Sequence, residues 1–254
     1  MVSRVLKNSI FLRIYAGLVV LVVVVAVFCY LLVQIINYQR AQEYRESLTD
    51  GISYVISEGV ARQPEKQQKL DWISDASDLL ELPIYYVDAA RVELSRTERK
   101  RIAEQKSVVR YDANNGIGYV IIGLKDDPKH FLYIKVDKIG ERQMKALPIF
   151  VLDYLIFYPG QEREYLEKIK KHFYYPIEIA DIRDINLDSE QIGRLRQGQS
   201  VLLYKDSASI RGTTISIVSP MPNHPAQVLV LGPVPMFNWM PFQLAAGITL
   251  FSLF

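Results

Sequence analysis

The stretch PIYYVDAARVELSRTERKRIAEQKSVVRY, residues 83–111, decides the fold because it recurs as PIEIADIRDINLDSEQIGRLRQGQSVLLY at residues 176–204. The two stretches align without a gap at a shift of 93 residues, and eight of the 29 positions are identical. Unrelated stretches of average composition would share about two. The identical pairs are Pro83/Pro176, Ile84/Ile177, Asp88/Asp181, Leu94/Leu187, Arg101/Arg194, Ser107/Ser200, Val108/Val201 and Tyr111/Tyr204. Such a repeat indicates two similar structural units in one chain.

Both copies favour a strand, then a short helix, then more strands. Ser95 and Glu98 form a capping-box pair, which predicts a helix that begins at Ser95, and Asp188 and Gln191 stand at the equivalent positions. Leu132, Ile134 and Val136 alternate with other side chains, as expected of a half-buried antiparallel sheet. The first half is predicted to contain helices at 37–62 and 65–81 and strands at 83–88, 106–111, 118–124 and 130–136.

From residue 139 the order of elements repeats, with helices to 158 and to about 173, followed by strands that end at 228–231. We therefore predict an α+β fold of two tandem PAS-like modules, at residues 37–138 and 139–235. Each module is expected to combine a helix pair with a small antiparallel sheet.

Two hydrophobic segments are predicted to cross a membrane. Ile14–Ile36 contains 23 residues without a charge, which as a helix suffices for a hydrocarbon layer of about 30 Å. Met236–Phe254 is the second uncharged run, and because it stops without a polar flank we expect it to be the start of a truncated second span. Cys29, the only cysteine, lies in the first span, so the segment between the spans has no intrachain disulfide.

The flanking charges predict the orientation. Residues 1–13 carry Arg4, Lys7 and Arg13 and no acid, so the positive-inside rule places this tail in the cytoplasm and residues 37–235 outside. The outer segment then has 30 − 3 = 27 Lys and Arg against 28 Asp and Glu, a net charge of −1. Nucleic acid is therefore not an expected partner, whereas the lipid bilayer is.

Two apolar patterns leave alternatives open. Tyr44, Leu48, Ile52, Ile56 and Val60, with Ala41 and Val55 beside them, form a helical stripe that either packs on its own domain or partly contacts the same helix of a second subunit. Arg40 and other charged residues fill the opposite faces. The apolar stretch 148–158 either is buried between modules or subunits, or lines a small-molecule pocket with its aromatic rings.

No residues are predicted to form a catalytic, cofactor or metal site, and the ligand-binding residues are unknown. His130, His172 and His224 lie in different predicted elements without metal-ligand spacing, which indicates surface or turn positions. Phosphate-binding and nucleophile-elbow motifs are absent from the sequence. Weaker candidates are a basic run for anions, at Arg96, Arg99, Lys100 and Arg101, and an acidic set for a divalent cation, at Asp181, Asp184 and Asp188. The pairing of Arg101 with Arg194 in the repeat favours a structural role for that position.

The segment Gly232-Pro233-Val234-Pro235 follows the last predicted strand directly. Two prolines favour extended, stiff backbone, so we expect either a rigid link from sheet to membrane or a simple end to the strand. In the first case, replacing it by Gly-Ser would uncouple the sheet from the second span.

The second half of the chain resembles the periplasmic domain of BfmS/RstB-type sensor histidine kinases. The likeness rests on Leu187-Asp188, on Arg194-Leu195-Arg196 with Gly198, and on the run 228–235 that leads into a hydrophobic segment. It extends over essentially the whole chain, through residues 9–17, 37–40 and 238–242. The resemblance implies a homodimer in the bacterial inner membrane that phosphorylates itself on histidine and passes the phosphate to a response regulator.

The kinase residues of this family have no counterpart in the sequence. The family's phospho-acceptor has the form H-E-x-R-T/S-P, whereas the three histidines here precede Phe131, Phe173 and Pro225. ATP and Mg²⁺ are therefore expected only for a kinase portion beyond this chain. The same layout would suit a chemoreceptor, a cyclase or a non-enzymatic envelope-binding membrane protein, and only the resemblance favours the kinase.

Overall fold

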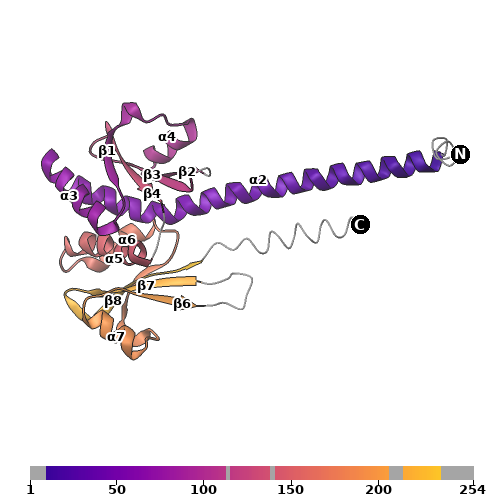
Figure 1. Cartoon of the computed structure of the whole chain (residues 1–254). Coiled ribbons are helices and arrows are strands. Elements are labelled where there is room, and N and C mark those ends of the chain that lie inside the picture. The colour runs from indigo at the N-terminus through magenta and orange to yellow at the C-terminus, as the bar shows by residue number, and fades with distance from the viewer. Residues whose placement is uncertain (1–9, 113–114, 138–140, 206–213, 236–254) are drawn as a thin grey trace. The chain divides into compact units, whose positions relative to one another are not determined.

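The computed structural model describes residues 10–112, 115–137, 141–205 and 214–235. They fall into two units, the described residues up to Glu43 and those from Tyr44 onwards. Helix α2 (Ile10–Ala61) runs without a break through residues of both (Figure 1).

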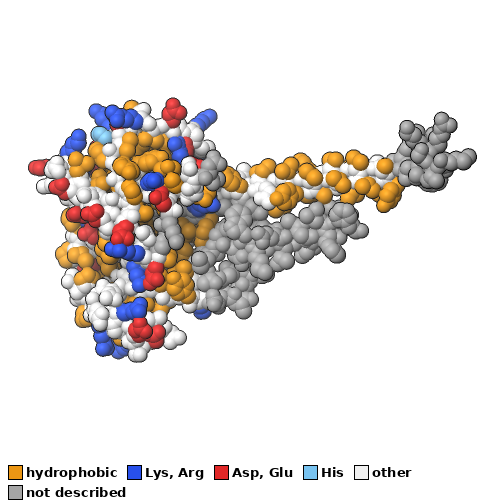
Figure 2. Space-filling model, in the orientation of Figure 1, with side chains coloured by type: hydrophobic (Ala, Val, Ile, Leu, Met, Phe, Trp, Pro, Cys, Tyr) orange, Lys and Arg blue, Asp and Glu red, His pale blue; other side chains and the backbone are white. Residues whose placement is uncertain are grey.

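The first unit contains the helical segment Ile14–Ile36. This segment of 23 residues is long and apolar enough to cross a membrane. Hydrophobic side chains are spread along the visible surface of the helix (Figure 2). Within the described residues it is the single helix of this kind. The second predicted span, 236–254, and the tail 1–9 lie outside the described residues.

The first half of the second unit continues from α2 into a helix and a four-stranded sheet. The sheet order is β1-β4-β3-β2, and all neighbouring strands are antiparallel. Its elements are α3 (Lys66–Leu80), β1 (Ile84–Asp88), the 3-10 turn η1 (Ala89–Arg91), α4 (Arg96–Ala103), β2 (Val108–Asp112), β3 (Ile117–Gly123) and β4 (His130–Val136).

The second half has the same sheet order, β5-β8-β7-β6, again antiparallel throughout. The predicted α+β class with small antiparallel sheets is thus confirmed. The elements are α5 (Glu141–Ile156), α6 (Glu162–Lys170), β5 (Ile177–Asp181), the 3-10 turn η2 (Ile182–Asp184), α7 (Ser189–Arg196), β6 (Val201–Lys205), β7 (Thr214–Met221) and β8 (His224–Pro235).

The two short helices begin as the capping pattern predicts. The Ser95 hydroxyl accepts from the Glu98 N–H while the Glu98 carboxylate accepts from the Ser95 N–H, and Asp188 and Gln191 make the same exchange. Each pair satisfies two backbone donors that a helix start otherwise leaves unpaired. Asp88 and Asp181, which also correspond in the repeat, each cap the 3-10 turn that follows their strand.

One main core joins the two halves of the second unit. It contains buried residues of α2, α3, α5 and α6 together with one face of each sheet, for example Leu132 and Ile134 of β4 and Leu229 and Leu231 of β8. Helices therefore fill the space between the two inner sheet faces. The apolar stripe of α2 belongs to this core, because Ile52, Val55, Ile56 and Val60 are buried and Leu48 is partly buried against them.

This packing resolves one open alternative for the stripe. Its part from Ile52 to Val60 packs on its own domain, as the first interpretation states, and has no surface left for a second subunit. The side chains of Arg40 and Ala41 lie outside the described residues.

Part of the outer face of each sheet is covered as well, so the predicted half-buried pattern holds only in part. Residues of η1 and α4 pack with Val108, Ile121 and Phe131 on the first sheet, and Leu195 of α7 packs with Val201, Val218 and Val228 on the second. Phe131 on the outer face and Leu132 on the inner face are therefore both buried. A strand covered on both faces has no need for a polar side, which explains continuous apolar runs such as 228–231.

A second correction concerns Gly232–Pro235, which belong to β8 and do not form a link after it. Ile215 pairs with Val234 and Thr214 with Pro235, so β7 extends the ladder past the predicted end. The pairs with β5 stop at Ile177 and Leu231, and a segment paired on one side only tolerates prolines. The stiffness that the sequence indicates is therefore that of a sheet strand.

Candidate functional site

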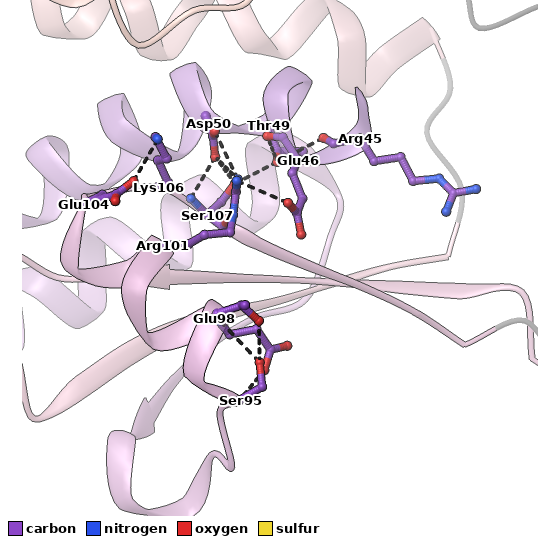
Figure 3. A network of polar contacts seen from close by, with 11 residues as sticks. Arg45, Glu46, Thr49, Asp50, Ser95, Glu98, Arg101, Glu104, Lys106 and Ser107 are labelled. Carbon is purple, nitrogen blue, oxygen red and sulfur yellow. Dashed lines mark hydrogen bonds and ion pairs between the residues drawn. The ribbon is translucent and has the colours of Figure 1, made fainter. Parts of the chain in front are cut away.

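A polar network fixes helix α2 to the first sheet (Figure 3). Glu46, Thr49 and Asp50 lie on one face of α2, because residues three and four apart in a helix are neighbours. They meet Arg101, near the end of α4, and Ser107, immediately before β2. The capping box at Ser95 sets where α4 begins and so helps to direct Arg101 towards α2.

The Asp50 carboxylate is the centre of this network. Both of its oxygens accept from Arg101 Nη2, at 3.0 and 3.1 Å, and Oδ1 also accepts from the Ser107 N–H at 2.9 Å and the Ser107 hydroxyl at 2.8 Å. Arg101 Nη1 lies 3.2 Å from a Glu46 oxygen, and its Nε donates to the Ser107 carbonyl at 2.9 Å. Thr49 Oγ1 is 2.8 Å from Ser107 Oγ.

The network is shielded from water. Ser107 is fully buried, and the side chains of Asp50 and Glu46 are each 14% exposed, against 25% for Arg101. Charge-assisted hydrogen bonds of this kind are stronger than neutral ones and are weakened less by salt than surface pairs. A further bond, from the Ser57 hydroxyl to the Gly123 carbonyl at 3.1 Å, ties the next turns of α2 to the end of β3. These contacts therefore join helix α2 to the first sheet.

The predicted basic run is divided by this arrangement. Arg101 points into the network, Arg99 donates to the Leu94 carbonyl, and Lys100 lies 3.8 Å from Glu104 in an exposed pair. Arg194, the repeat partner of Arg101, forms an ion pair with the exposed Glu190 at 2.5 Å. The structural role expected for position 101 is confirmed, but the repeat does not extend it to position 194.

The acidic set does not converge on a cation position either. Among the described residues no group of three or more His, Cys, Asp and Glu side chains is arranged to hold a metal ion. Asp181 binds Arg183 through both carboxylate oxygens, and Asp188 caps α7.

Two of the three histidines lie in contacts that the sequence does not indicate. His130 stacks on Tyr86 with ring centroids 4.3 Å apart, and its Nδ1 lies 2.9 Å from both oxygens of Asp127. The Tyr86 hydroxyl donates to the same carboxylate. Burial acts to raise the pKa of Asp127, but the hydrogen bonds from Tyr86 and His130 outweigh it and lower that pKa. Partial burial and Asp127 raise the pKa of Tyr86.

His172 stacks on Tyr54 of α2, with centroids 3.7 Å apart and planes 10° from parallel. Burial and the charge of Lys171 lower the pKa of His172 below 6.5, although Asp50 acts in the opposite direction. His224 lies at the exposed start of β8.

The contact of His172 predicts a pH dependence of stability. Because the folded pKa is depressed, the unfolded state binds more protons, so the free energy of unfolding falls as the pH drops below 6.5. The variant His172→Phe keeps a ring against Tyr54 and removes the titrating group. Urea unfolding between neutral and mildly acidic pH should show a smaller decline for this variant, and an unchanged decline would contradict the assignment.

The aromatic residues of the stretch 148–158 pack against each other instead of lining a cavity. Phe150 and Tyr154 are buried in the core, and Tyr158 stacks on Tyr165 of α6 with centroids 3.5 Å apart. Arg62 lies over the rings of Tyr154 and Phe157 and donates to Asp153 at 3.2 Å. The stretch is therefore buried only in part, because Phe150, Val151 and Tyr154 lie in the core while Ile149, Ile156 and Phe157 are exposed.

In comparisons with models of known protein families and with curated proteins, no match to the chain was found.

Proposed function

We propose that this chain is the sensory and transmembrane input region of a two-component sensor histidine kinase of the BfmS/RstB type. In this proposal it lies in a bacterial inner membrane, with residues 37–235 in the periplasm and the N-terminus in the cytoplasm. It detects an envelope signal and transmits it to a cytoplasmic kinase, which phosphorylates a response regulator.

The observation that carries the proposal is that three functional segments follow one another along helix α2. The same helix contains the apolar segment Ile14–Ile36 and the core residues Ile52–Val60, and between them the network around Asp50. The backbone hydrogen bonds of such a helix give a displacement at the sheet a continuous route towards the apolar segment. This is what a receptor requires when its stimulus and its output lie on opposite sides of a membrane.

The matched halves of the second unit support the PAS-like, tandem part of the proposal. Both sheets have the equivalent strand order, both short helices begin with a capping box, and Asp88 and Asp181 cap equivalent turns. We interpret them as two modules of one plan that share a core. A shared core gives a signal that is received by one module a direct route to the other.

The partners follow from this assignment. The parent kinase would act as a homodimer in the lipid bilayer, contact its response regulator through the cytoplasmic part, and bind a periplasmic ligand or protein. ATP and Mg²⁺ would be bound by the kinase portion and not by this chain. Signal transfer then needs two states of the sensor that differ by only a few kcal/mol.

The proposal is tested by reading the coding sequence downstream of the Phe254 codon. We expect a linker domain followed by H-E-x-R-T/S-P and glycine-rich ATP-binding motifs. A methyl-accepting coiled coil or a cyclase domain would assign the chain to another receptor class. A stop codon would leave a non-enzymatic envelope-binding membrane protein.

A further inference from the structure

A wide groove lies between helix α5 and the part of the second sheet that is next to helix α7. Its volume is about 1010 Å³, at the upper limit of typical small-molecule sites. Side chains of α3 and α5 form one wall, and η2, the end of α7 and the β7–β8 turn, with Pro222 and Pro225, form the other. The lining is mainly aliphatic, unlike the aromatic pocket that the sequence suggested.

The α5 wall changes character along the helix axis. Arg142 and Lys145 lie in its first turns, and Ile149, Leu152 and Ile156 follow on the same side of the helix. Ile149 is 42% exposed and Ile156 is 39% exposed, so this apolar surface is not covered by the domain itself. From Lys145 to Ile156 the helix rises by about 17 Å, which gives the groove a cationic end and an apolar length.

A third cation belongs to the lining, because Arg196 closes α7 and also lines the groove. Hydrogen bonding and the charge of Lys145 lower the pKa of Glu141, in the first turn of α5, and the charge of Arg194 on α7 acts in the same direction. The start of α5 adds the partial positive charge of a helix N-terminus.

Both cations of α5 already have acidic partners, which a ligand would have to replace. Asp153 is bound by Arg62, so Asp78 is the other carboxylate in the lining. Arg142 pairs with Glu81 and Lys145 with Glu141, both at 2.6 Å, but neither acid lines the groove. Exposed ion pairs contribute little net stability, so the carboxylate of a ligand can replace these partners at small cost.

We propose that this groove binds a small amphiphilic anion, with its carboxylate at Arg142 and Lys145 and its alkyl chain along Ile149 and Ile156. The complementarity is twofold: the anion meets the cationic end, and the chain covers the exposed isoleucines. As a stimulus for the receptor this ligand rests on the proposed function, whereas binding itself does not depend on a kinase.

The experiment uses single-cysteine variants of the full chain in phosphatidylcholine nanodiscs, because Cys29 is the only native cysteine. In a Cys29→Ser background, Ile149→Cys reports on the groove and Tyr85→Cys, a 50% exposed position of β1 outside the lining, is the matched control. The rate of alkylation by a neutral maleimide is measured with octanoate, with octyltrimethylammonium, and without either. We expect octanoate to slow labelling at position 149 about tenfold at saturation, since a bound ligand buries most of its surface in such a site.

Labelling at position 85 should not change, and octyltrimethylammonium should protect position 149 much less than octanoate. Adding Arg142→Gln and Lys145→Gln should abolish the protection, whereas Asp78→Asn should preserve it. Absence of protection at position 149, or equal protection by the two amphiphiles, overturns the proposal. A third outcome also overturns it. If labelling at position 149 slows without any amphiphile as the protein density in the nanodiscs rises, a second copy of the chain covers the groove. None of these outcomes depends on what the gene encodes after Phe254.

Discussion

Replacing Arg101 by methionine is expected to lower the free energy of unfolding by about 2 kcal/mol. The substitution removes the guanidinium that binds Asp50, Glu46 and the Ser107 carbonyl and keeps an unbranched apolar stem. Asp50 keeps its hydrogen bonds from Ser107, but both shielded carboxylates lose the cation that they share. The cost is mainly the loss of this charge partner.

The repeat supplies the control for this prediction. Arg194 occupies the equivalent position and contacts the exposed Glu190, so Arg194→Met should cost less than about 0.5 kcal/mol. Urea unfolding of the full chain can be followed by the fluorescence of Trp72, whose ring lies against Gly59 and near Phe150, with Trp239→Phe in every variant.

A double variant separates coupling from general damage. Asp50→Asn removes one of the two charges that Arg101 neutralises, so combining it with Arg101→Met should cost less than the sum of the single changes. Equal costs for Arg101→Met and Arg194→Met, or strict additivity of the pair, would show that the network does not stabilise α2 against the sheet.

The local features of the fold could be predicted from sequence because they depend on neighbouring residues. The capping boxes at Ser95 and Asp188 span three positions each, and the strand His130–Val136 is bounded by a turn with Asp126, Asp127 and Pro128. Such signals depend on hydrogen bonds and φ preferences within a few residues. For the same reason the α+β class could be derived without any knowledge of how the elements pack.

The Asp50 network could not be predicted because it joins residues that lie more than fifty positions apart. A single sequence does not show how close α2 and α4 lie to each other. A carboxylate on a helix usually belongs to a face that is exposed to solvent. The one available signal was the flanking of Asp50 by Leu48 and Ile52, which puts the acid beside a core-facing stripe. The stacked His172 was missed for a similar reason, since His172 lies in the turn after α6 whereas Tyr54 lies far away in the sequence, on α2.

The largest effect of a single substitution is expected at Gly232, where Gly232→Ala should lower the free energy of unfolding by about 3 kcal/mol. Its φ of +116° lies in the region that favours glycine. A Cβ at this position would lie 2.7 Å from the Ile215 carbonyl oxygen and 3.0 Å from the Ser216 Cα. Both atoms belong to the backbone of β7, so neither can rotate away, and the pair β7–β8 would have to separate locally.

Gly160→Ala is the matched control, because Gly160 has a φ of +80° but no heavy atom within 4 Å of an added Cβ. It tests backbone strain alone and should cost about 1 kcal/mol. Urea unfolding monitored by Trp72 measures both variants.

The comparison also distinguishes the two interpretations of the segment from Gly232 to Pro235. In a link outside the sheet, Gly232 would have no strand beside it, and its replacement by alanine would cost no more than that of Gly160. In strand β8, the close approach of β7 adds a steric cost to the strain. A clear excess for Gly232→Ala therefore supports a sheet that continues to Pro235, and it means that a Gly-Ser replacement of these residues would remove sheet pairing as well as stiffness. Equal costs would restore the link and with it the simpler reason for uncoupling.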